Sequence, residues 1–164
     1  HETSGDGALA VREIQSIVFR EPATPAAAAA AAPANAPSAP PASDSFDASG
    51  WDAHRLLVPS EGLLFRYSAL TFNSHRIHYD RPYATEAEGY RGLVVHGPLT
   101  ATLLLDLAAR HFGDNRLTTF DFRGTSPAIC NETLHLALRG TSAHIELGAF
   151  ARDGRQVMAA SAAI

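Results

Sequence analysis

Apolar side chains recur at helical spacing through residues 99–112. This spacing places five of them on one face of a helix: Leu99, Leu103, Leu104, Leu107 and Ala108. Gly97-Pro98, directly before the run, fits a tight turn that leads a proline into the first helical turn. The pattern therefore predicts one long helix over residues 98–112.

Runs of β-favouring residues lie on both sides of this helix. They predict strands at 62–67, 116–124, 132–139, 143–151 and 155–164. Asp153-Gly154, between the last two strands, is a strong hairpin signal. One antiparallel sheet wrapped around one long central helix is an α+β arrangement, and this is the fold class that the pattern predicts.

The N-terminal part of the chain differs in composition from the rest. Residues 8–20 predict a strand with no partner nearby in the sequence. Residues 22–43 hold an alanine run and six prolines, which is typical of a semi-rigid spacer. We interpret them as an interdomain linker between a remnant strand (1–21) and a globular domain (44–164). The alternative is a disordered surface insertion within one domain.

Composition narrows the classes of function. Of the 164 residues 46% are apolar and 18% charged, so a real core can form. The net charge of −4, without basic clusters, argues against a nucleic-acid partner. Cys130 is the only cysteine, which excludes an internal disulfide and a cysteine-only zinc site. No apolar run is long enough for a membrane span, and we expect a cytoplasmic protein. The chain begins at His1, so we expect a fragment or a processed product.

Two neighbouring motifs carry candidate chemistry. Residues 73–80 read Asn-Ser-His-Arg-Ile-His-Tyr-Asp and bring imidazole, amide and carboxylate groups close together. His96-Gly97 leads into the predicted helix, whose N-terminal backbone N–H favours negative charge. A base beside such a donor suits chemistry next to a carbonyl.

These histidines have two other interpretations. A zinc site would draw its ligands from His75, His78, Asp80 and His96. The three-residue spacing of the first two histidines is common, however, and eight histidines in one chain produce such pairs by chance. Alternatively, His78 is an ordinary core histidine with its hydrogen bonds satisfied.

The runs at 65–80 and 90–99 closely resemble the C-terminal half of the double-hotdog, MaoC-like hydratases. This family includes the mesaconyl-CoA (3-methylfumaryl-CoA) hydratases and the type 2 hydroxyacyl-thioester dehydratases. The resemblance covers about residues 51–164, and residues 1–20 look like the last strands of the family's N-terminal hotdog. It implies a hotdog fold for a catalytic domain at 44–164, an acyl-thioester substrate, and a first hotdog largely absent from this chain.

The resemblance also implies roles for three residues. In the wider group the hydration motif reads Gly-Asp-x-Asn-Pro-x-His, so His78 takes the catalytic imidazole position and Asn73 stands where the group has Asp. Gly97 matches the glycine whose backbone N–H faces the thioester oxygen. Positions 74–76 read Ser-His-Arg instead of x-Asn-Pro, which departs from the wider motif but resembles the subfamily.

The same roles follow from chemistry. Hydration of an α,β-unsaturated thioester needs a base for water, a proton donor to the α-carbon, and a stabiliser of the enolate oxygen. An unperturbed histidine titrates near pH ~6.5, so neutral His78 can accept the proton. Asn73 cannot titrate and can only hold the water, while the Gly97 N–H would face the enolate.

Other residues of the motifs are predicted to contact substrate: Arg76, His75, Asp80, His96 and Tyr90. Arg76 is the best candidate to bind a second carboxylate of a dicarboxylic substrate, because guanidinium binds carboxylate in a bidentate manner. For His75 and Asp80 we favour loop orientation over proton transfer. His135 and His144, on predicted strands, are expected to be exposed or half-buried.

We therefore predict a hydratase or dehydratase of an acyl-CoA thioester, with no cofactor and no metal. The competing functions are a non-catalytic acyl-CoA-binding or assembly hotdog and an acyl-CoA thioesterase. The expected partners are the substrate and either a second copy of the chain or a companion hotdog. Without one of these, the unpaired sheet would be exposed and solubility poor.

Overall fold

The computed structural model describes residues 1–17 and 44–164. The chain divides into two compact units, and the boundary falls between the described ranges. The predicted linker, 22–43, lies outside the described residues. None of the described helices combines the length and the apolar character needed to cross a bilayer.

The first unit is a two-stranded hairpin. Strands β1 (Glu2–Gly5) and β2 (Ala8–Arg12) pair antiparallel across a turn in which Asp6 and Gly7 have positive φ. The predicted strand at 8–20 is therefore wrong in extent, because β2 ends at Arg12, and wrong in lacking a near partner. The turn at Asp6-Gly7 was the missed signal, since this dipeptide favours a tight hairpin.

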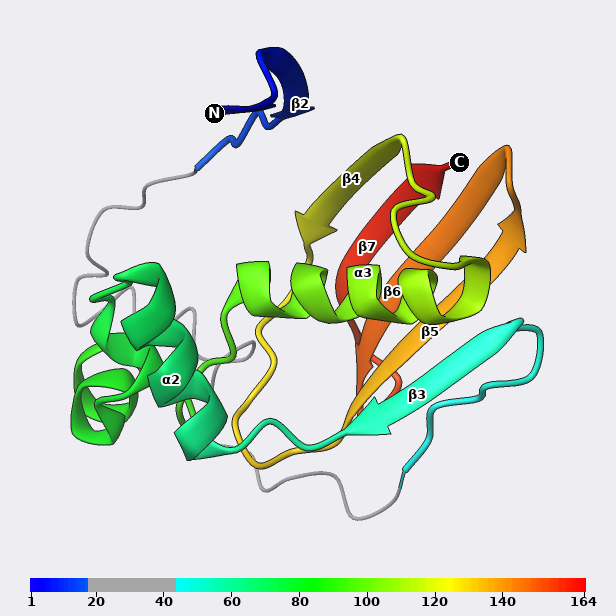
Figure 1. Cartoon of the computed structure of the whole chain (residues 1–164). Helices are drawn as coiled ribbons and strands as arrows, with labels where there is room; N and C mark the ends of the chain where they lie inside the picture. Colours follow the sequence, from blue (N-terminus) through cyan, green and yellow to red (C-terminus); the bar gives the residue numbers. More distant parts are fainter. Residues whose placement is uncertain (18–43) are drawn as a thin grey trace. The chain divides into compact units, whose positions relative to one another are not determined.

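The second unit is one antiparallel sheet with a long helix across it (Figure 1). The sheet order is β3-β5-β6-β7-β4. The strands are β3 (Ala53–Leu57), β4 (Thr119–Gly124), β5 (Leu134–Thr141), β6 (His144–Ala151) and β7 (Gln156–Ala163). The four strands predicted after the helix are confirmed, with shifts of a few residues at their ends. The hairpin turn at Asp153-Gly154 is confirmed as well, with Gly154 at φ +79°.

Helix α3 (Gly97–Phe112) confirms the predicted long helix. It packs on β3, β5, β6 and β7, as Figure 1 shows. Of its predicted apolar face, Leu99, Leu104, Leu107 and Ala108 are buried and Leu103 is partly buried. These side chains meet the leucines of β5, which alternate along the strand and so share one face of the sheet.

The predicted strand at 62–67 is wrong. These residues belong to helix α2 (Glu61–Thr71), which Ser60 caps by accepting a hydrogen bond from Leu63 N–H. Leu64 and Ser68, four residues apart, are the buried positions of this helix. The first strand of the sheet is instead β3, which the sequence pattern did not reveal. Short β-favouring runs fit either structure, and here the N-cap and the buried spacing select the helix.

Candidate active site

His78 is buried at the end of a short 3₁₀ turn, η1 (Arg76–His78), which follows α2. Its Nδ1 lies 2.7 Å from the carbonyl oxygen of Val94. A carbonyl can only accept, so Nδ1 carries the hydrogen and donates it. The other ring nitrogen, Nε2, therefore holds the lone pair. The fold thus fixes the tautomer in which His78 can act as a base.

His96 directly precedes α3 and is completely buried. Its ring stacks on that of His78, with centroids 3.6 Å apart and planes 17° from parallel. Its Nε2 lies 2.8 Å from the hydroxyl oxygen of Ser68 on α2. Tyr67 meets the His96 ring edge-on at 4.9 Å. Two residues predicted from separate motifs are therefore in direct contact.

Both stacked imidazoles are held neutral. Burial lowers the pKa of His78, against the raising effect of the Val94 hydrogen bond, and nearby His75 lowers it further. Burial lowers the pKa of His96 to about 4, and His78 adds to that shift. Because both pKa values lie below 6.5, both rings are uncharged at neutral pH. A neutral imidazole with a free lone pair is what a general base requires.

Asn73 lies just beyond the end of α2, where Phe72 adopts a left-handed conformation with φ 54°. The side-chain oxygen of Asn73 accepts the backbone N–H of His75 at 2.9 Å. Because that donor must meet an oxygen, the amide orientation is fixed, and the NH₂ group is the one that can donate to a ligand. His75 itself is exposed and places its ring edge-on to His78 at 5.6 Å.

Gly97 is the first residue of α3 and is exposed. The first N–H groups of a helix have no intrahelical acceptor, and the helix dipole makes this end positive. Since Gly97 follows His96, its N–H lies one residue from the stacked rings. The structure thus brings together three predicted residues, His75, His78 and His96, and Gly97 directly follows the last of them in the chain.

Arg76 and Asp80 pair with each other. Arg76 donates from Nε and Nη2 to one carboxylate oxygen of Asp80, at 2.9 and 2.7 Å, and lies over the ring of Tyr83 at 4.2 Å. This contact lowers the pKa of Asp80 and raises that of Arg76. The pair orders the loop after η1. Substrate contact by either residue stays a prediction.

Tyr90 follows the π-helical turn η2 (Tyr83–Ala87) and packs, partly buried, against the core. Its backbone N–H bonds to the carbonyl of Ala84 at 2.9 Å. Its predicted role in substrate contact also stays a prediction. Within residues 1–17 and 44–164, no cluster of three or more His, Cys, Asp or Glu side chains could hold a metal ion.

A mostly apolar groove of about 300 Å³ lies beside α2. Its lining residues are Phe65, Ser68, Ala69, Phe72, Asn73, Ser74 and Tyr79. Ser68 and Asn73 connect this groove to the histidines, the first through His96 and the second through His75. Reasoning from the sequence missed Ser68 and the aromatic walls, because it treated 62–67 as a strand. In a helix, Ser68 falls one turn after buried Leu64, which would have been the signal.

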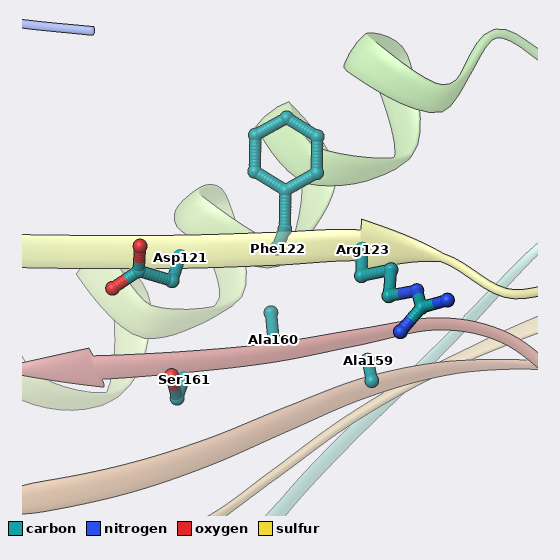
Figure 2. Close-up of a pocket in the computed structure, with 6 residues that line it drawn as sticks. All are labelled: Asp121, Phe122, Arg123, Ala159, Ala160 and Ser161. Atoms are coloured by element: carbon teal, nitrogen blue, oxygen red, sulfur yellow. The ribbon is translucent and has the colours of Figure 1, made fainter. Parts of the chain in front are cut away.

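A second hollow, of about 340 Å³, lies over strands β4 and β7 and is separate from these histidines (Figure 2). It is lined by Asp121, Phe122, Arg123, Ala159, Ala160 and Ser161, none of which is a predicted site residue. Figure 2 shows Phe122 pointing to the opposite side of β4 from Asp121 and Arg123. We therefore assign the candidate chemistry to the groove beside α2.

Known proteins resemble this chain over most of its length. The profile of the family described as hydroxyacyl-thioester dehydratase type 2 matches residues 1–130. Mesaconyl-C(4)-CoA hydratase from Chloroflexus aurantiacus is 43% identical over 153 residues, which cover 93% of this chain and 50% of that protein. The mitochondrial hydroxyacyl-thioester dehydratase type 2 of Schizosaccharomyces pombe is 38% identical over 88 residues, covering 52% of this chain and 29% of that protein. The chain thus spans half or less of the length of these relatives.

Solved structures agree on the fold. The (R)-hydratase from A. caviae, described as involved in PHA biosynthesis, matches with a TM-score of 0.63 at 16% identity. The match covers 73% of this chain and 96% of that one. A similarity at such low sequence identity supports the fold alone. The hotdog fold expected from the resemblance is confirmed.

Proposed function

Because this chain belongs to the hydroxyacyl-thioester dehydratase type 2 family, we propose that residues 44–164 carry the catalytic groups of a hydro-lyase. The reaction is the reversible addition of water to the double bond of an α,β-unsaturated acyl-CoA thioester. The observation that carries this proposal is the fixed tautomer of His78, whose basic Nε2 lies on a ring stacked beside the start of α3.

His78 moves the proton in the proposed reaction. Its Nε2 takes a proton from water, and the resulting hydroxide adds to the β-carbon of the thioester. The electron pair of the double bond then moves toward the thioester oxygen as an enolate forms. Protonated His78 returns the proton to the α-carbon, which completes the addition without any other acid. Asn73 donates from its amide NH₂ to the attacking water and orients it.

Gly97 stabilises the enolate. Its N–H at the positive end of a 16-residue helix donates to the thioester oxygen as negative charge develops there. The pairing of a neutral base with a preorganised N–H donor suits this chemistry, because the base moves the proton while the N–H stabilises the enolate. No cation is needed for either role.

The proposed substrate class is a dicarboxylic enoyl thioester, as the name of the mesaconyl-C(4)-CoA hydratase suggests. The groove beside α2 offers apolar walls for the acyl chain, from Phe65 and Phe72. Arg76, half-exposed at the motif, is the proposed contact for the second carboxylate. A substrate carboxylate would compete with Asp80 for this guanidinium, so Arg76→Lys should weaken binding of dicarboxylic thioesters more than of crotonyl-CoA.

The test is the change in enoyl absorbance when the purified full-length protein meets mesaconyl-type and crotonyl thioesters. We expect hydration of the mesaconyl type to be the more efficient, and His78→Ala to reduce turnover by about 10²–10⁴-fold. His144→Ala, at an exposed histidine on β6, is the matched control and should leave turnover unchanged. Full turnover by His78→Ala would refute the mechanism. Equal use of crotonyl-CoA would refute only the dicarboxylic substrate.

A companion hotdog is part of the proposal. The chain aligns over 93% of its length with half of the Chloroflexus protein. Its N-terminal hairpin exposes Leu9 and Val11, and the segment that follows β2 exposes Ile14 and Ile17. We propose that residues 1–21 end a companion hotdog, that 22–43 link it to 44–164, and that a companion domain or second copy covers the exposed surface. A well-behaved monomer of the isolated chain by light scattering would contradict this. The proposed location is the cytoplasm, to be checked by cell fractionation.

A further inference from the structure

Ser68 and His96 form a buried hydrogen-bonded pair to which the proposed reaction assigns no step. Ser68 lies on α2, and His96 lies 28 residues later at the start of α3. Their Oγ and Nε2 atoms are 2.8 Å apart, and both residues are buried, with exposures of 7% and 0%. A polar contact at this depth between two separate elements fixes their relative position.

The consequence for His78 comes through the stack. The His96 ring lies face to face with the His78 ring at 3.6 Å, and Tyr67 contacts the His96 ring by its edge. At this separation the two rings are in contact, so neither can tilt out of its plane without moving the other. The hydrogen bond that His78 Nδ1 donates to the Val94 carbonyl fixes one nitrogen of the ring, and the stack restrains the plane of the ring.

We propose that Ser68 and His96 are positioning residues that hold the His78 imidazole in its reactive orientation. The inference rests on the proposed function, since it concerns the same base. The Ser68 hydroxyl fixes the His96 ring through Nε2, and the His96 ring in turn fixes the plane of His78. Neither residue transfers a proton to the substrate in this role.

The same contact resembles a serine nucleophile activated by histidine, and two observations argue against that role. In serine enzymes a third group orients the histidine, whereas the Nδ1 of His96 has no hydrogen-bond partner among the described residues. The pKa of His96, lowered to about 4, also makes the ring a weak base. Ser68 is therefore placed to hold His96, and the thioester is not expected to acylate it.

Ser68→Ala tests the proposal in the assembled enzyme. We expect kcat to fall about tenfold, because the base is held less firmly. KM should change less than twofold. Without Ser68 as its partner, the His96 ring turns and the His78 ring becomes more hydrated. This raises the His78 pKa, so the acidic limb of kcat/KM should move toward pH ~6.5. Ser68→Thr keeps the hydroxyl and should retain both kcat and the limb. Thr102→Ala removes an exposed hydroxyl from α3 and is the control for hydroxyl loss.

A measurement without turnover separates this proposal from the proposed function. The His78 ring is titrated by NMR in the wild type, in Ser68→Ala and in Ser68→Cys, which nearly conserves the volume if the alanine variant fails to fold. A rise of the His78 pKa in these variants supports positioning. An unchanged pKa together with unchanged kcat overturns it, even if His78→Ala is inactive. An acyl adduct on Ser68, or thiol release that Ser68→Ala abolishes, also overturns it and favours a nucleophile.

Discussion

Two pairs of histidines lie on different faces of this domain and are built differently. The inner pair, His78 and His96, stacks at the start of α3 with ring centroids 3.6 Å apart. The outer pair, His54 on β3 and His135 on β5, has centroids 5.2 Å apart and is joined by a 3.0 Å contact between Nε2 and Nδ1. Because Arg55 contacts Asp106 of α3, its strand neighbour His54 faces away from the helix.

A carboxylate lies beside the outer pair, whereas none of the described carboxylates is paired with the inner one. Asp44 Oδ2 lies 3.0 Å from Nε2 of His135, at ion-pair distance although not aligned as a good hydrogen bond. The ring of Phe46 stacks over both outer imidazoles, at 4.6 Å from His135 and 5.3 Å from His54. His135 is thus buried, and the prediction that it is exposed or half-buried is wrong, because residues 44–46 cover this part of the sheet.

This difference in surroundings shows which imidazoles remain available as bases. A nearby carboxylate favours the protonated ring, and Asp44 accordingly opposes the lowering of the His54 pKa that burial and His135 cause. Among the described residues the inner rings meet no carboxylate, and the hydrogen bond from His78 to the Val94 carbonyl only partly offsets the lowering of the His78 pKa by burial. The outer pair therefore anchors residues 44–46, while the inner pair keeps a lone pair for chemistry.

The largest expected effect concerns the backbone N–H of Gly97, at the start of the helix beside the inner pair. Gly97→Pro removes the proposed oxyanion N–H, and the loss of one such donor reduces kcat by about 10²–10³-fold. Gly97→Ala keeps the N–H, and its added Cβ would meet only Met158 Cε, at 4.0 Å. The alanine variant should therefore stay close to wild type in the enoyl-absorbance assay. Similar activity for both variants would exclude this N–H as the stabiliser.

A smaller effect concerns stability against pH. The pKa of His96 is about 4 in the folded protein and near 6.5 when unfolded. The folded state therefore binds fewer protons, so stability is complete above about pH 6.5 and decreases as the pH falls toward 4. From pH ~7 to ~5 this histidine should lower the free energy of unfolding by about 2 kcal/mol, measured by urea titration. His78, whose pKa is also lowered, acts in the same direction.

This prediction is tested with two matched variants, one in each pair of histidines. His96→Asn should flatten the pH dependence of unfolding, whatever its effect on stability at neutral pH. His54→Asn should flatten it less, because His54 is exposed and loses less hydration on folding. Equal slopes for the wild type and His96→Asn would show that this ring is not the source.

The smallest effect is expected at the outer pair. Asp44→Asn removes the negative charge beside His135, and because Asp44 is partly exposed we expect a loss of about 1 kcal/mol or less in unfolding free energy. The enoyl turnover should not change, since within the described part of the chain the polar and ring contacts of the outer pair involve Asp44 and Phe46 and none of the proposed site residues. Urea unfolding and the absorbance assay, run on the same preparation, measure the two quantities. A large loss of turnover in Asp44→Asn would mean that the two pairs are coupled.

Much of the fold was predictable because its signals are local. The long helix follows from five apolar side chains at helical spacing, and the β6–β7 hairpin from Asp153-Gly154. The motif at 73–80 and the His96-Gly97 step pointed to His78 and the start of α3. In each case a few adjacent residues carry the preference, so the pattern can be read without knowing what packs against it.

Tertiary structure decided what local preference leaves open. Residues 62–67 favour a strand by composition, yet they are helical because Ser60 caps α2 and its buried positions recur four residues apart. Ser68, from α2, and the Val94 carbonyl reach the two histidines from 28 and 16 residues away. The burial of His135 likewise depends on neighbours in space, because residues 44–46 cover it. The sequence by itself determined which groups could do chemistry, and only packing decided which nitrogen stays basic, because hydrogen bonding and desolvation act through contacts distant along the chain.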